Sequence, residues 1–81
     1  MKSSVNHALK LRIEELLKKK KITRYRLAMN SGVTHSTLKN IMQDNIKDNL
    51  LSTVILIARG FDMKVSEFLN TPLFNELNIS I

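Results

Sequence analysis

The chain has 81 residues, 43% of them hydrophobic, which fits one small domain with a compact core and excludes a disordered chain. It has no cysteine, no apolar run long enough to cross a bilayer and no signal-peptide pattern, so we expect a cytoplasmic protein without disulfides or thiolate metal sites. The net charge of +6 is unevenly distributed along the chain. Residues 1–47 hold 11 Lys or Arg and 3 acidic residues, whereas residues 48–81 hold 2 Lys or Arg and 4 acidic residues. A polyanion such as nucleic acid or anionic lipid is therefore the expected partner of the basic half.

The first predicted helix spans about residues 4–20. Charged side chains, Arg12 among them, are expected on its exposed surface, and Ser3, Ser4 or Asn6 is expected to cap its start. The basic run Lys18–Lys21 lies where the helix ends, and cations there complement the helix dipole. It is interpreted as a solvated helix end, with proximity to DNA phosphates as the alternative. The apolar residues that recur at three- and four-residue spacing, and so predict one buried face, are Val5, Leu9, Ile13, Leu16 and Leu17.

Two shorter helices follow, over about residues 23–30 and 34–43, and each begins at a threonine. The hydroxyls of Thr23 and Thr34 can accept a hydrogen bond from an early backbone N–H of the helix that follows. Between the helices, Gly32 can take a positive φ at little steric cost, and Val33 is expected to enter the core.

The faces of these two helices are predicted from the same sequence pattern. Apolar residues should point into the core, and short polar or basic residues should remain outside on the third helix. The side chains expected inside are Tyr25, Leu27, Ala28, Met29, Leu38, Ile41 and Met42. The side chains expected outside on the third helix are His35, Ser36, Lys39 and Asn40.

The second half of the chain predicts two more helices. The fourth, over about residues 50–60, follows Asn49 as its cap, and Gly60 can end it. The fifth covers about residues 65–70, and Pro72 closes it. We therefore expect an all-α domain over residues 1–71 and a tail, residues 72–81, that packs on the domain or on a dimer interface.

Two threonine-capped helices joined by a short turn with a glycine form a helix-turn-helix unit. A helix fits the major groove of DNA, where each base pair shows a distinct pattern of donors and acceptors. Asn40 can pair bidentately with adenine, and His35 or Lys39 can donate to the acceptors of guanine. The exposed face of the third helix is therefore the candidate reader of bases.

The segment Thr23–Ile41, with its Leu-Ala and Ser-Gly-Val-Thr spacing, resembles the helix-turn-helix domain of the phage repressor, Cro and Xre family. The later segments Ile57–Met63 and Val65–Leu69 resemble the same family's fourth and fifth helices, so the resemblance covers residues 9–69. It implies a compact, five-helix, lambda-repressor-like fold. It also implies a sequence-specific, DNA-binding transcriptional regulator that reads the major groove with its third helix.

The resemblance also implies roles for individual residues. Base contacts are expected from His35, Ser36, Lys39 and Asn40. Phosphate contacts are expected from Thr23, Arg24, Thr34, Thr37, Gln43 and Lys47. Two departures from the family pattern stand out: Leu17 and Met42 replace an Arg–Glu ion pair, which predicts a hydrophobic contact, and Gln43-Asp44 replaces the Asn-Gly turn after the third helix.

The apolar residues of the fourth helix surround it, so one small core cannot bury them all. A second apolar face is expected to meet another protein, and the alternative is that the tail covers it. The favoured function is a homodimeric repressor of the phage or mobile-element type that binds double-stranded DNA at an inverted repeat. Control by dimer concentration or by a protein antagonist is expected. The residues expected at the dimer interface are Leu50, Ile55, Leu56, Leu73, Phe74 and Leu77.

Other functions are weighed against this one. An antitoxin-like interaction module with secondary DNA binding is the alternative. A membrane-surface role is disfavoured because the Lys-rich first helix has no Trp or Phe anchor. No metal or other cofactor is expected, since His7 and His35 have no carboxylate or thiolate partners at ligand spacing, and His7 is interpreted as an ordinary helix residue. No nucleophile–base pair or phosphate loop is present in the sequence, so an enzyme is not expected.

Overall fold

The computed structural model describes residues 5–46 and 48–75. Within these ranges it has no strand, which confirms the all-α prediction, and it has one more short helix than the five expected. The helices are α1 (Val5–Lys20), α2 (Arg24–Ser31), α3 (His35–Met42), α4 (Leu51–Gly60), α5 (Val65–Leu69) and α6 (Pro72–Asn75). No helix in the described part of the chain is long and apolar enough to span a membrane.

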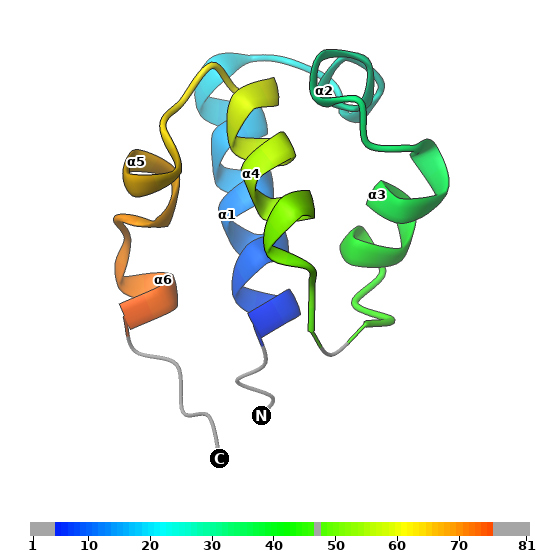
Figure 1. Cartoon of the computed structure of the whole chain (residues 1–81). Coiled ribbons are helices and arrows are strands. Elements are labelled where there is room, and N and C mark those ends of the chain that lie inside the picture. Colours follow the sequence, from blue (N-terminus) through cyan, green and yellow to red (C-terminus); the bar gives the residue numbers. More distant parts are fainter. Residues whose placement is uncertain (1–4, 47, 76–81) are drawn as a thin grey trace.

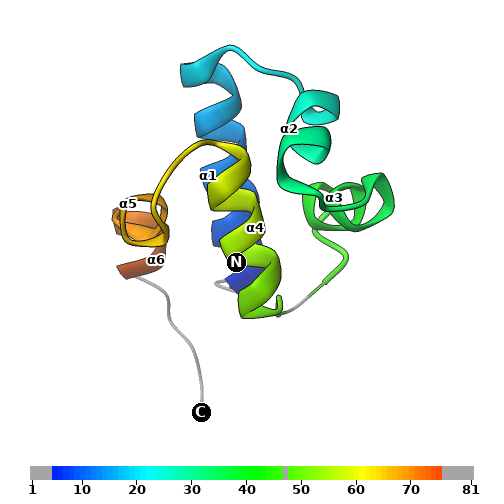
Figure 2. The same cartoon turned by 45° about the horizontal axis from the view of Figure 1, so that its top comes forward.

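The helices form three groups in space. α1 and α4 occupy the middle of the molecule, α2 and α3 lie on one side of them, and α5 and α6 lie on the other side (Figure 1; Figure 2). The main contacts follow this arrangement: α2 packs on α4 and α3, α3 packs on α1, α5 packs on α4, and α6 packs on α1. The helix-turn-helix pair α2–α3 is thus held from behind by both central helices.

The hydrophobic core draws on every helix from α1 to α5. Phe61 and Phe68 are its largest buried side chains, and their rings stack with centroids 6.3 Å apart. Leu17 packs against the same core that buries Met42, so the positions of the family's ion pair are both apolar and both part of the core. The fully buried aliphatic residues at its centre are Leu9, Ile13, Leu27, Ile41 and Ile57.

The predicted burial of two residues of α2 is wrong. Tyr25 is 61% exposed and Met29 is 57% exposed. The helix has eight residues, and its inward face is made by Leu27, Ala28 and Ser31. Tyr25 and Met29 are four positions apart, so they share a face of the helix, and that face points away from the core. Apolar character alone does not decide burial in so short a helix.

The two asparagines expected as caps form a buried link instead. α4 begins after Leu50, which makes no side-chain cap hydrogen bond, and Asn49 Nδ2 donates to Asn6 Oδ1 at 3.1 Å. Asn6 is fully buried, and its Nδ2 donates to the Ile41 carbonyl at 3.2 Å and to Asp44 Oδ1 at 2.8 Å. The Asn6 amide therefore joins the start of α1 to the end of α3 and to the segment before α4.

Pro72 begins a helix rather than closing one. α5 already ends at Leu69, and Pro72 is the first residue of α6, where proline's missing N–H and fixed φ fit the start of a helix. The ring of Phe74 lies 6.3 Å from that of Phe68 and packs against the core. The described start of the predicted tail thus packs on the domain, whereas Leu77 lies outside the described residues.

Arg12 was expected on the exposed surface, and it is instead the connection between α1 and α5. Its Nε donates to the Phe68 carbonyl at 2.8 Å and its Nη2 donates to the Glu67 carbonyl at 3.0 Å. Its Nη1 donates to Glu15 Oε1 at 2.7 Å, and the guanidinium lies 5.7 Å from the centre of the Phe68 ring. The fork of donors thus ties α1 to two carbonyls at the end of α5, one of which, that of Glu67, also accepts from the Asn70 N–H at 3.2 Å.

The turn after α3 is built on Asp44, which stands where the family usually has Asn-Gly. Asp44 adopts a left-handed conformation with φ 56°, and aspartate tolerates this region better than most residues. Its carboxylate accepts from Asn6, and its Oδ2 lies 2.8 Å from His7 Nδ1. These hydrogen bonds from Asn6 and His7 lower the pKa of Asp44 below its ordinary value of 3.8. His7 is therefore part of the turn's support, a role that the sequence did not indicate.

Acid should destabilise the fold through Asp44. Because its pKa is lowered in the folded state, its carboxylate adds stability that is fully present above about pH 4 and is lost as the pH falls through the lowered value. In Asp44→Asn this part of the pH dependence should disappear. Thermal unfolding followed by circular dichroism between pH 6 and pH 2 measures it. Asp48→Asn, which removes an exposed carboxylate, is the control, and an equal loss of pH dependence in both variants would contradict the assignment.

Candidate nucleic-acid interface

Both helices of the α2–α3 pair begin with the predicted threonine cap. Thr23 Oγ1 accepts from the Arg26 N–H at 3.1 Å, and Thr34 Oγ1 accepts from the Thr37 N–H at 3.1 Å. The Thr34 hydroxyl also donates to Thr37 Oγ1 at 3.0 Å. These bonds satisfy N–H groups that each helix start leaves free and fix where α2 and α3 begin.

The turn between the helices is held by its own hydrogen bonds. Gly32 has φ 79°, as predicted, and its N–H donates to the Ala28 carbonyl at 3.0 Å. No role was predicted for the Ser31 side chain, yet its buried hydroxyl donates to the Ala28 carbonyl at 3.3 Å and accepts from the Val33 N–H at 3.1 Å. Val33 is buried, as predicted, so the turn has a defined shape and sets the angle between the two helices.

α3 separates into a buried face and an exposed face. Leu38, Ile41 and Met42 are buried in the core, which confirms their predicted positions. The four predicted base-contact residues are all exposed. With one side packed on the core and short polar side chains on the other, α3 has the arrangement that a helix needs to enter a groove.

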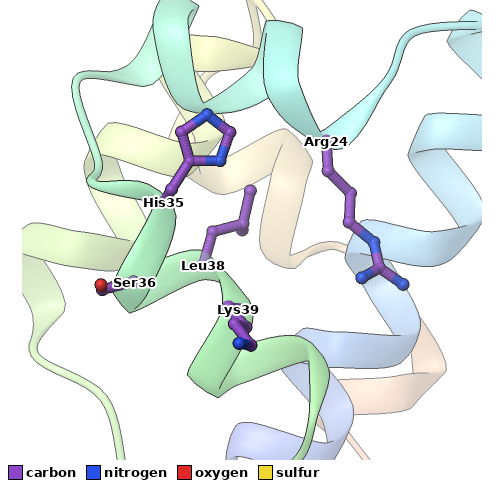
Figure 3. A pocket seen from close by; sticks show the side chains of 5 residues that line it. All are labelled: Arg24, His35, Ser36, Leu38 and Lys39. Atoms are coloured by element: carbon purple, nitrogen blue, oxygen red, sulfur yellow. The ribbon is translucent and has the colours of Figure 1, made fainter.

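The starts of α2 and α3 border an open hollow, which Figure 3 shows from close by. Arg24 reaches in from the start of α2, and the other lining residues come from α3: His35, Ser36, Leu38 and Lys39. The imidazole of His35 points toward α2, whereas Ser36 points away from Arg24 (Figure 3). The structure therefore places Arg24, His35 and Lys39 around the apolar Leu38, with Ser36 at the edge of the same hollow. Asn40 is exposed outside this lining.

The predicted phosphate-contact residues do not form one cluster. Arg24 is exposed at the hollow, whereas the Thr23 and Thr34 hydroxyls are engaged as caps. Gln43 is exposed beyond the end of α3, and its Oε1 accepts from Asn45 Nδ2 at 3.1 Å. Lys47 lies outside the described residues, and Thr37 is half-buried.

Two exposed features were missed or given a different role in the sequence. The ring of Tyr25 lies 5.3 Å from that of His35, with an angle of 31° between the planes. The pair joins α2 to the first residue of α3, and a tyrosine one position after Arg24 was its only signal. The exposed run Lys18–Lys21 covers the end of α1, and only Ile22 separates it from Thr23, so the chain itself places its charge close to the start of α2.

The described residues contain no group of His, Asp or Glu side chains that could hold a metal ion. In a comparison with known families, residues 12–72 match the Cro/C1-type HTH DNA-binding domain. The match includes α2, the turn and α3 in full. Comparison with curated proteins and with solved structures found no match.

Proposed function

The chain belongs to the family of Cro/C1-type HTH DNA-binding domains, and on that premise we propose that it is a repressor of the phage or mobile-element type that reads an operator with α3. A DNA-binding transcription regulator is what the family match supports directly. We propose in addition that α3 reads the bases, that the protein represses transcription and that it acts as a homodimer.

The exposed face of α3 carries this proposal. Leu38, Ile41 and Met42 attach the helix to the core, so its outward side chains keep a fixed orientation. Asn40 presents an amide that suits adenine, and Lys39 presents donors that suit guanine. In this account α3 supplies specificity, and cations around the starts of α2 and α3 supply affinity that does not depend on sequence.

Substitution of Arg24 tests the proposed phosphate contacts most directly. Arg24→Ala should weaken binding to operator and random DNA by the same factor, because a phosphate contact carries no sequence information. Each protomer of the proposed dimer loses one phosphate contact, so the magnitude of the slope of log K against log salt should fall by about 1 per protomer, or about 2 for the dimer. Fluorescence anisotropy titrations from about 0.05 to 0.3 M salt measure both quantities.

The matched control for Arg24 is Lys64→Ala. It removes the same charge next to α5, on the other side of the central helices from α2 and α3 (Figure 1). Its salt slope should stay close to that of the unchanged protein. If both variants lowered the slope equally, the cation at position 24 would act through net charge alone and its contact role would be wrong.

The outward face of α4 supports the homodimer in this proposal. Leu50 is 73% exposed, Leu51 is 66% exposed, and Leu56 is also exposed. α6 packs on α1 rather than over these leucines, and Phe74 is partly buried against the core. We therefore place the interface on Leu50, Leu51, Ile55 and Leu56, and a two-fold dimer of this kind suits an inverted repeat with half-sites about one DNA turn apart.

Sedimentation equilibrium tests the dimer. The unchanged protein should be dimeric at tens of micromolar, and Leu51→Glu should be monomeric because it places a charge in an apolar contact. Ser66→Glu adds the same charge on α5 and should remain dimeric. A monomeric unchanged protein would contradict the dimer, and a protein partner on the same α4 face, as in the antitoxin-like alternative, would then be favoured.

A further inference from the structure

Tyr25 is a large aromatic side chain on the outside of a small domain. The residue is 61% exposed, so the core does not depend on it. Its one recorded ring partner among the described residues is His35, the first residue of α3, with ring centroids 5.3 Å apart. His35 is itself exposed and lines the hollow between α2 and α3. The contact thus joins an exposed residue of α2 to an exposed residue of the candidate reading helix.

We propose that Tyr25 is a positioning residue for specificity, which acts by holding the His35 imidazole on the α2 side of the reading helix. This inference rests on the proposed function, because it assigns to Tyr25 a part in the base reading of α3. The partner that the arrangement fits is a purine, whose N7 in the major groove accepts a single hydrogen bond from a ring N–H.

The argument for positioning begins with the freedom of the His35 side chain. An exposed histidine at the start of a helix samples several rotamers, and binding must select one of them at an entropic cost. The Tyr25 ring, which packs against the imidazole with an angle of 31° between the two planes, restricts that sampling before the protein meets DNA. The observed orientation agrees with such a restraint: the His35 imidazole points toward α2, away from the direction that Ser36 takes (Figure 3).

The support beneath Tyr25 is itself fixed. α2 begins at the Thr23 cap and ends at the hydrogen-bonded turn of Ser31 and Gly32, so the distance between positions 25 and 35 is set by the fold. The backbone that carries Tyr25 is therefore fixed while its side chain is exposed, and a side chain of this kind can orient a neighbour for binding.

Selection of bound duplexes, followed by competition titrations on the selected operator, tests the proposal. The variants are Tyr25→Leu, Tyr25→Phe, His35→Ala and the double variant Tyr25→Leu/His35→Ala. Tyr25→Leu should lose roughly three- to ten-fold of the preference at the purine that His35→Ala also loses, the range expected for one aromatic pair. Tyr25→Phe keeps the ring and should keep the preference. The double variant should lose no more than His35→Ala alone, because Tyr25 acts through His35.

Thermal unfolding separates this role from a structural one. Because Tyr25 is exposed, Tyr25→Leu should leave the melting temperature nearly unchanged while it changes base preference. Unchanged preference in Tyr25→Leu would overturn the proposal, as would an equal loss on every sequence in both Tyr25→Leu and Tyr25→Phe, which would indicate a hydroxyl contact to phosphate. If the unchanged protein selected no motif, both the proposed function and this inference would be wrong. If it selected a motif that is the same in Tyr25→Leu, only this inference would be wrong.

Discussion

Gly60→Ala is expected to lower the free energy of unfolding by about 2 kcal/mol, within the range for overpacking a well-filled contact. A Cβ at position 60 would lie 2.7 Å from Ser31 Cβ, 3.0 Å from Leu27 Cδ1 and 3.2 Å from Ser31 Cα. The leucine end can move, but the atoms of Ser31 belong to the turn between α2 and α3. The new methyl group would therefore push the end of α2 away from α4.

The same change should weaken DNA binding, because the Ser31 hydroxyl holds the Val33 N–H and so fixes the turn. Urea unfolding and operator titration measure the two effects. Arg59→Ala, at the exposed neighbouring position, should stay within about 0.5 kcal/mol of the unchanged protein. In Gly60→Ala/Ser31→Gly the closest clash is removed, so the double variant should be more stable than the sum of the single losses predicts. Additive losses would show that the contact between these two residues is not the cause.

Asn40→Ala is expected to remove the discrimination at one base pair of each half-site, worth roughly 1–3 kcal/mol per base pair, while binding to random DNA stays nearly unchanged. Asn40 is exposed, and the Asn45 N–H that approaches it at 3.1 Å bonds to its backbone carbonyl, so the substitution leaves the turn after α3 intact. Competition titrations with the operator and its single-base variants measure the loss.

Gln43→Ala is the control for Asn40→Ala, since it removes an exposed amide of similar chemistry at a predicted phosphate contact. It should weaken binding to all DNA sequences by the same factor and leave the base preference unchanged. Equal losses on operator and random DNA for Asn40→Ala would show that this side chain does not read a base.

Local features of the helix-turn-helix could be predicted from the sequence because each depends on residues a few positions apart. The Thr23 and Thr34 caps, the positive φ of Gly32 and the burial of Val33 are confirmed. The exposure of the polar face of α3 is confirmed as well. Their roles toward DNA stay predictions, since they depend on a partner that the chain does not specify.

Features that join distant segments could not be predicted in this way. Asn6 and Asn49 are 43 positions apart, and Arg12 reaches a carbonyl 56 positions away. Each of these side chains looked like a cap or an exposed residue because its partner is far along the chain. Gly60 likewise was expected only to end α4, and its close approach to Ser31 emerges from the packing of α2 on α4.

The central claim, that α3 reads a two-fold-symmetric operator, is tested most directly by selecting bound duplexes from a random DNA pool at about 0.15 M salt and sequencing them. The account predicts an enriched inverted repeat with half-sites about one helical turn apart, and the loss of the preference at one position of each half-site in His35→Ala or Asn40→Ala. Retention of DNA without any enriched motif would contradict it, and would leave a basic protein that binds DNA through its charge alone.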